Sequence, residues 1–180
     1  MTKCKLLMYI SCFIILCMCS CSNNEKNTDI SSYGNFNEYV RRDLEKSIAL
    51  LPKTIPSDAT VDNYIYSYSC APLGDPNYSI LLCLRFSDEN SFGFEKNRIV
   101  ELIGENVTIT NSEGKEWYYW GETKVGLEQL NNTEIHDGLF VRITYAMIDY
   151  ENRQIIYAVG VLVDGSTYDD DIIDIGCRGL

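Results

Sequence analysis

Histidine is nearly absent from this sequence, and the cysteines of its body are few and widely spaced. The 180 residues include one histidine, His136, and eight cysteines. Five of those cysteines lie in the first 21 residues, which leaves Cys70, Cys83 and Cys177 in the body. A zinc site usually draws on several His or Cys ligands at short spacing, and a disulfide scaffold needs more pairs. We therefore predict no metal site, no cofactor and no disulfide-rich fold, and leave one bridge among the three body cysteines open.

Basic residues are also scarce. The chain has 15 Lys and Arg against 26 Asp and Glu, a formal charge of −11. Two of the lysines precede residue 21 and all the acids follow it, so the remainder carries 13 positive and 26 negative charges, or −13. Phosphate binding requires clustered Lys and Arg, which excludes nucleic acid as a partner. A domain this acidic also has no electrostatic attraction to an anionic membrane surface.

The N-terminal apolar run is too short to span a membrane. It covers residues 6–18, LLMYISCFIILCM, and such a run is about 20 Å long as a helix, against a hydrocarbon core of about 30 Å. The run follows five residues that contain Lys3 and Lys5 and no acid. This arrangement is typical of a signal peptide.

The residues that follow, Leu16-Cys17-Met18-Cys19-Ser20-Cys21-Ser22, resemble the lipobox of bacterial lipoproteins. In that pattern an aliphatic residue at −3 and a small residue at −1 precede the modified cysteine. Cys21 has Ser20 at −1, whereas Cys19 has the bulky Met18 there. The resemblance implies a lipid anchor on Cys21 at the extracytoplasmic face of the cell membrane, where two acyl chains suffice for stable anchoring. The competing interpretations are a plain secretory signal and an uncleaved membrane anchor.

Three segments follow from this pattern. Residues 1–20 are predicted to be the signal peptide, and residues 21–35, which are polar and rich in Ser and Asn, a lipidated cysteine and a flexible tether. Residues 36–180 are predicted to form a single domain. The body resembles uncharacterised lipoproteins of low-GC Gram-positive bacteria, with a leading helix that ends at Leu51-Pro52 and a Tyr-rich strand after it. No activity is implied by that resemblance.

Periodicity in the body predicts an α+β fold. Apolar residues at helical spacing predict a helix over residues 36–51 and a second over 88–103, the latter running through Phe92, Glu95, Ile99 and Leu102 and ending at Gly104. Alternation predicts three strand pairs, 61–70 with 78–86, 107–110 with 116–121 and 139–149 with 153–163, and a short helix is expected over 124–131. The short connections predict an antiparallel sheet of about five to six strands with the N-terminal helix and the second helix packed on one face.

The last strand pair also predicts a register. Apolar side chains alternate along both strands, and the two apolar sets share a face if the turn has three residues, 151–153. That expectation assumes that one face of the sheet is buried.

Aromatic residues are abundant, with 13 tyrosines and two tryptophans. Trp117 and Trp120 flank two tyrosines on a predicted strand, and Tyr64, Tyr66 and Tyr68 form a one-sided stripe. Rings with polar tips suit recognition of proteins, peptides or glycans, so these five residues are the predicted ligand-binding surface. The competing interpretation is that a sheet favours Tyr and Trp and that helices cover them.

No catalytic residue emerges from the sequence. His136 and Asp137 are adjacent, but no nucleophile motif accompanies them. Five aspartates fall within residues 164–174, but in an order that does not match a calcium-binding loop. We therefore expect a non-enzymatic binding or accessory domain at the cell surface. The alternative is a cell-envelope hydrolase that uses carboxylates the sequence does not identify.

Overall fold

The structure of the chain is a computed structural model that describes residues 23–34, 45–70, 77–104, 107–125, 127, 140–163, 172, 175–176 and 178–179. Several predictions fall outside these residues. They concern the signal peptide with Cys19 and Cys21, the His136 segment, and the aspartates of residues 164–174. Among the described helices, none is long and apolar enough to cross a membrane.

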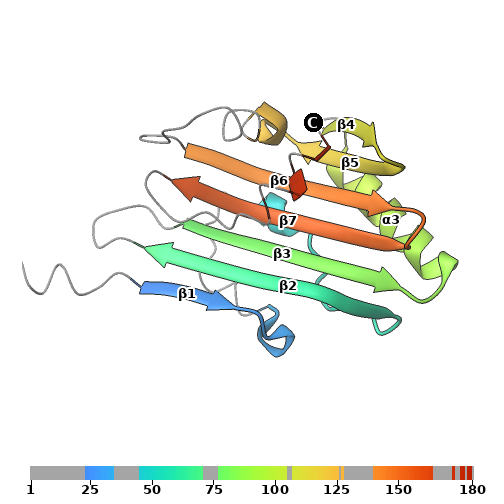
Figure 1. The fold of residues 1–180 in the computed structure, drawn as a ribbon, viewed down its shortest axis with the longest axis horizontal. Coiled ribbons are helices and arrows are strands. Elements are labelled where there is room, and N and C mark those ends of the chain that lie inside the picture. The colour runs from blue at the N-terminus through green and yellow to red at the C-terminus, as the bar shows by residue number, and fades with distance from the viewer. Residues whose placement is uncertain are drawn as a thin grey trace, which may run out of the picture.

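A seven-stranded sheet, antiparallel at every pairing, dominates the described fold (Figure 1). Its spatial order is β1-β2-β3-β7-β6-β5-β4. The strands are β1 (Asn23–Asn27), β2 (Ala59–Cys70), β3 (Asn77–Phe86), β4 (Val107–Ser112), β5 (Lys115–Trp120), β6 (Phe140–Asp149) and β7 (Gln154–Val163).

The predicted α+β class with two packed helices is wrong, because the described chain is mostly β. Its one long helix is α3 (Glu89–Ile103), which begins at the predicted place: the Asp88 carboxylate caps it by accepting from the backbone of Asn90 and Ser91. The predicted helix over residues 36–51 is described from residue 45 onward, and there α2 (Glu45–Ile48) is a single turn.

Helix α2 ends before the buried Leu50 and Leu51. Their backbone N–H groups donate to the carbonyls of Ser47 and Ile48, three residues back rather than four. Such tightened bonds are common where an α-helix terminates. The chain then continues to Asp58 as an irregular segment that packs beside α3.

Residues 23–34 are ordered, in contrast to the predicted flexible tether. Strand β1 pairs with β2 from Asn23↔Cys70 to Asn27↔Tyr66, and η1 (Ile30–Ser32) follows it. The Tyr33 ring then packs edge-on against Tyr64 at a centroid distance of 5.8 Å. Strand β1 consists of polar residues, so apolar alternation does not predict it. It can still form, because an edge strand is held by backbone hydrogen bonds that depend little on side-chain type. The sheet therefore includes residues 23–27, which precede residue 36, the predicted first residue of the domain.

The three predicted strand pairs are present, and one has a different register. In β6 and β7, Ile148 pairs with Ile155 across a four-residue turn, 150–153, not the predicted three. Arg153 has a φ of 48° in this turn, and the buried Asp149 accepts hydrogen bonds from Asn152. With this register the two apolar sets point to opposite faces of the sheet.

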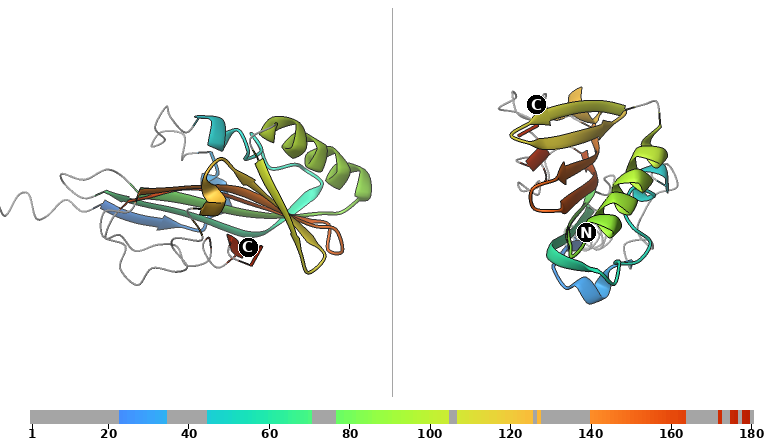
Figure 2. Two further views of the ribbon diagram at one scale, coloured as in Figure 1. Left: turned by 90° about the horizontal axis from the view of Figure 1, so that it is seen from above. Right: turned by 90° about the vertical axis from the view of Figure 1, so that its right-hand side faces the viewer.

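Both faces of the sheet are buried, which explains the register. The first core lies under α3 and residues 48–59, and its sheet residues include Tyr64, Tyr66, Ile80, Leu82, Tyr118, Ile148, Tyr157 and Val159. The second core lies on the other face, where Leu127, Ile172 and Ile175 cover Ile65, Leu81, Trp117, Tyr119, Ile143, Tyr145, Met147 and Ile156. Figure 2, left, shows the C-terminus on the face opposite α3.

Candidate functional site

The structure buries most of the predicted aromatic surface. Trp117 is 2% exposed, Tyr64 3% and Tyr66 5%, while Tyr68 and Trp120 are half-buried and pack against the first core. Trp117 belongs to the second core instead. The five rings therefore do not form one exposed face, and their burial agrees with the competing interpretation that an antiparallel sheet uses aromatics for packing.

A groove lies elsewhere, between α3 and residues 48–58, which comprise the end of α2 and the irregular segment after it. Its volume is about 1130 Å³, comparable to the upper range of ligand-binding clefts. We call it the α3 groove. Its lining residues are Gly34, Ile48, Ala49, Leu51, Pro52, Lys53, Thr54, Pro56, Asp58, Phe86, Asn90, Ser91, Phe94, Glu95, Arg98 and Leu102.

The α3 groove has an apolar lining and balanced charges. Phe94 is its most accessible aromatic ring, with 76% of its surface exposed, whereas Phe92 on the same helix is 1% exposed and lies in the first core. Among the lining residues, two are cationic, Lys53 and Arg98, and two are anionic, Asp58 and Glu95. A groove with this lining favours an uncharged, apolar ligand, because a net charge on the ligand would find no surplus of the opposite sign.

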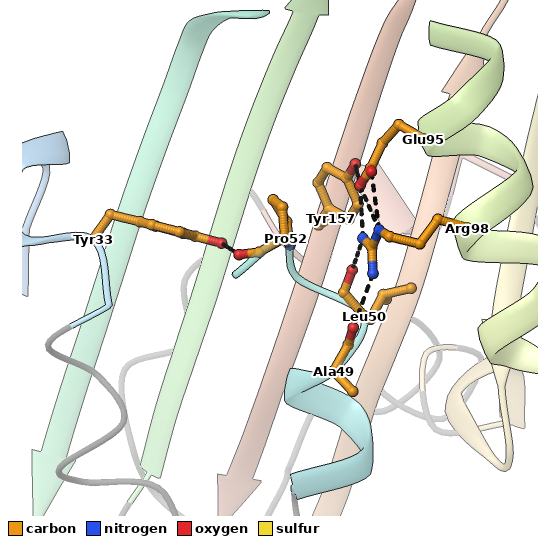
Figure 3. Close-up of polar contacts among 7 residues, drawn as sticks. All are labelled: Tyr33, Ala49, Leu50, Pro52, Glu95, Arg98 and Tyr157. Carbon is orange, nitrogen blue, oxygen red and sulfur yellow. Dashed lines mark hydrogen bonds and ion pairs between the residues drawn. The ribbon is translucent and has the colours of Figure 1, made fainter. Parts of the chain in front are cut away.

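One wall of the groove is fixed by a cluster of Glu95, Arg98 and Tyr157, which we call the Glu95 cluster (Figure 3). The Tyr157 hydroxyl donates to Glu95 Oε1 at 2.6 Å. Arg98 donates from Nε to both carboxylate oxygens at 3.0 and 2.9 Å and from a terminal nitrogen to Oε1 at 2.6 Å. Its terminal nitrogens also donate to the backbone carbonyls of Ala49 at 3.1 Å and Leu50 at 2.6 Å.

The cluster joins three parts of the fold: α3, strand β7 and the turn after α2. Glu95 is 5% exposed, and both of its carboxylate oxygens accept hydrogen bonds from within the protein. Tyr33 adds a fourth link, because its hydroxyl donates to the carbonyl of Pro52 at 2.5 Å. The cluster therefore positions the groove wall, and its geometry leaves Glu95 poorly placed to exchange protons with a ligand.

Burial and the nearby Glu95 carboxylate raise the pKa of Tyr157 well above its ordinary value. Burial lowers the pKa of Arg98, but the hydrogen bond and charge of Glu95 outweigh that effect, and the net change is upward. Both residues thus keep their protons and remain donors to Glu95 at neutral pH.

We expect alkaline pH to destabilise the fold through Tyr157. Because the folded pKa lies above the unfolded value of 10.0, the stabilisation is complete below about pH 10 and is lost as the pH rises further. Urea unfolding between pH 8 and 11 measures this loss. In Tyr157→Phe the dependence should become shallower, by up to about 1.4 kcal/mol per pH unit. An unchanged dependence in Tyr157→Phe would contradict the assignment.

Cysteine and metal chemistry find little support among the described residues. Cys83 is free and buried, and burial raises its pKa to about 12, so its thiol stays protonated at neutral pH and is a poor nucleophile. In the part of the chain that the structure describes, no group of three His, Cys, Asp or Glu side chains could hold a metal ion.

Searches against protein families, curated proteins and solved structures found no match to the chain. Its site is therefore interpreted from its own geometry. Sequence reasoning missed the α3 groove, because its walls come from segments about 40 residues apart. The sequence did single out Glu95, because this residue occupies a position on the predicted apolar face of its helix.

Proposed function

We propose that the chain is an exported lipoprotein, anchored through Cys21 to the extracytoplasmic face of the cell membrane, whose α3 groove binds an uncharged, apolar segment of a peptide or protein. The observation that carries the binding proposal is the groove itself, which has a volume of about 1130 Å³ and a mostly apolar lining. Its Phe94 side chain is 76% exposed. An exposed apolar concavity of this kind is the usual form of a recognition site.

The charge balance supports an uncharged ligand. Arg98 and Glu95 neutralise each other within the Glu95 cluster, and Lys53 and Asp58 are of opposite sign. No observation in the groove specifically favours the hydrolase alternative, because one of its two lining carboxylates, that of Glu95, is held by Arg98 and Tyr157.

We expect Phe94→Ala to weaken binding of N-phenylnaphthylamine, a neutral fluorescent probe, by at least about tenfold, because burial of a Phe side chain contributes about 1.5–3 kcal/mol. Uncharged peptides containing Leu and Phe should displace the probe, and highly charged peptides should not. The variant should keep its stability, since the ring is exposed.

Val100→Ala is the matched control. Val100 is 44% exposed on the same helix and does not line the groove. An equal effect of both substitutions, or none from Phe94→Ala, would count against the α3 groove as the binding site.

The anchor has its own prediction. Cys21→Ala should abolish incorporation of labelled palmitate and release the chain from the membrane fraction, because the thioether forms on that sulfur. Cys19→Ala should leave both unchanged. Continued labelling of Cys21→Ala would refute the assignment of Cys21.

A further inference from the structure

The structure bears on where the ligand of the α3 groove comes from. We infer that the groove lies in the half of the domain farthest from the bilayer, so that it takes its peptide segment from the aqueous side rather than apolar molecules from the membrane. This inference rests on the proposed lipid anchor at Cys21 and on the proposed binding function of the groove.

The anchor point and the sheet are separated by almost no chain. Strand β1 begins at Asn23, two residues after Cys21, and two residues span at most about 7 Å. With lipid on Cys21, the first residues of β1 are therefore held against the membrane surface. A longer tether would let the domain rotate freely, but here the sheet itself carries the attachment.

Strand register gives the distance from that attachment to the groove. Asn23 lies beside Cys70, the last residue of β2. Phe86, a lining residue, lies beside Ala59 at the opposite end of β2. Eleven steps along the strand correspond to about 36 Å.

The Glu95 cluster lies at an intermediate level. Tyr157 pairs with Leu82, which pairs with Tyr64, and Tyr64 is six steps, or about 20 Å, from Cys70. Figures 1 and 2 agree with this reading, since α3 and the start of β1 lie toward opposite ends of the sheet. The groove thus occupies the far half of the domain.

Electrostatic repulsion opposes an orientation of the domain that would bring the groove to the lipid. For that, the domain would have to lie flat on its α3 face and bring a larger part of its surface to the headgroups. The part of the chain after residue 20 carries a formal charge of −13, so an anionic bilayer repels close contact over a large area. Attachment at one end with the sheet upright keeps that contact smallest.

Site-specific quenching tests the orientation. The full chain, produced in cells and purified in detergent with its lipid, is reconstituted into vesicles of phosphatidylglycerol and phosphatidylethanolamine that contain a headgroup nitroxide quencher. A fluorescent amino acid replaces one exposed residue at a time: Arg142, Glu151 or Val100. Arg142 is level with Tyr68 through Val161 and Tyr78, near the start of β1, while Glu151 is in the turn at the far end and Val100 is on α3.

We expect quenching several-fold stronger at position 142 than at positions 151 and 100. Equal quenching at positions 142 and 151, or the strongest quenching at position 100, would overturn the inference and leave the anchor standing. Failure to incorporate palmitate would remove the anchor and the inference together. A groove that does not respond to Phe94→Ala would remove the binding function, whereas the quenching pattern reports orientation alone.

Discussion

Replacing Arg98 with Ala should lower the free energy of unfolding by about 2–4 kcal/mol, because it leaves the Glu95 carboxylate buried beside an apolar core without its counter-ion. The Glu95 side chain is 7% exposed and that of Arg98 27%. The expected loss of stability is smaller than for a fully buried ion pair, because water reaches the Arg98 side chain. The two hydrogen bonds to the carbonyls of Ala49 and Leu50 are lost as well.

The same substitution should open the α3 groove. Arg98 hydrogen-bonds α3 directly to the turn after α2, so its loss loosens one wall. Urea unfolding reports the stability, and phenylnaphthylamine binding reports the groove. Arg98→Lys should recover part of the stability, because an ammonium keeps the charge but not the planar set of donors that contacts two carbonyls and a carboxylate together.

Arg85→Ala is the matched control for Arg98. Arg85 pairs with Asp62 at 2.8 Å, but its side chain is 57% exposed. Exposed pairs contribute about 0–1 kcal/mol, so this variant should unfold at nearly the wild-type urea concentration. If the two arginine variants lose equal stability, the Glu95 cluster is no stronger than a surface ion pair, and its assigned role is incorrect.

Local patterns predicted much of the sheet. The pair β2 and β3 follows from alternation of Tyr64 and Tyr66 with Ile80 and Leu82, and all four lie in the first core. The start and end of α3 follow from Asp88 and Gly104, which are local capping residues. Such features depend on neighbours within a few residues, which is why they can be predicted from one sequence.

Features that depend on distant contacts were not predicted. The β6–β7 register depends on whether the second face is covered, and among the described residues that cover comes from Leu127, Ile172 and Ile175. Strand β1 depends on the free edge of β2, and β1 itself contains no apolar residue that would predict the pairing. The fold class was wrong for the same reason: a polar segment became a strand, and the described end of the predicted first helix is one turn.

The α3 groove belongs to this second group. Glu95 is informative, because it is a carboxylate at a position that the helical periodicity assigns to the core. Buried carboxylates are rare unless they are paired, so this residue indicated a partner. The partners, Arg98 and Tyr157, are 3 and 62 residues away, and periodicity could suggest the first but not the second.

The second large effect should come from the C-terminal segment. Removing residues 172–180 should lower the free energy of unfolding by at least about 4 kcal/mol, because four side-chain donors lose their acceptors and each such bond contributes about 1 kcal/mol. The donors are Thr110, Trp117, Tyr119 and Tyr145, which bond to the carbonyls of Gly179, Ile175, Gly176 and Ile172. Exposure of the second core adds to that loss.

A point substitution tests how the C-terminal segment packs against the sheet without removing the segment. A Cβ atom at position 179 would overlap the Tyr119 hydroxyl and come within 2.5 Å of the Trp117 ring, so Gly179→Ala must displace the segment or these two side chains and should cost about 1–3 kcal/mol. Fluorescence of the displaced Trp117, now 2% exposed, should shift to longer wavelength when measured in a Trp120→Phe background.

Gly93→Ala is the control for that variant, because a Cβ atom there meets nothing within 4 Å. Since Gly93 is inside α3, alanine should stabilise the helix by about 0.5–1 kcal/mol and leave Trp117 emission unchanged. Gly179→Ala would then lower stability where Gly93→Ala raises it. If Gly179→Ala instead leaves both stability and emission at wild-type values, the C-terminal segment does not seal the second core, and the explanation of the β6–β7 register by two buried faces fails with it.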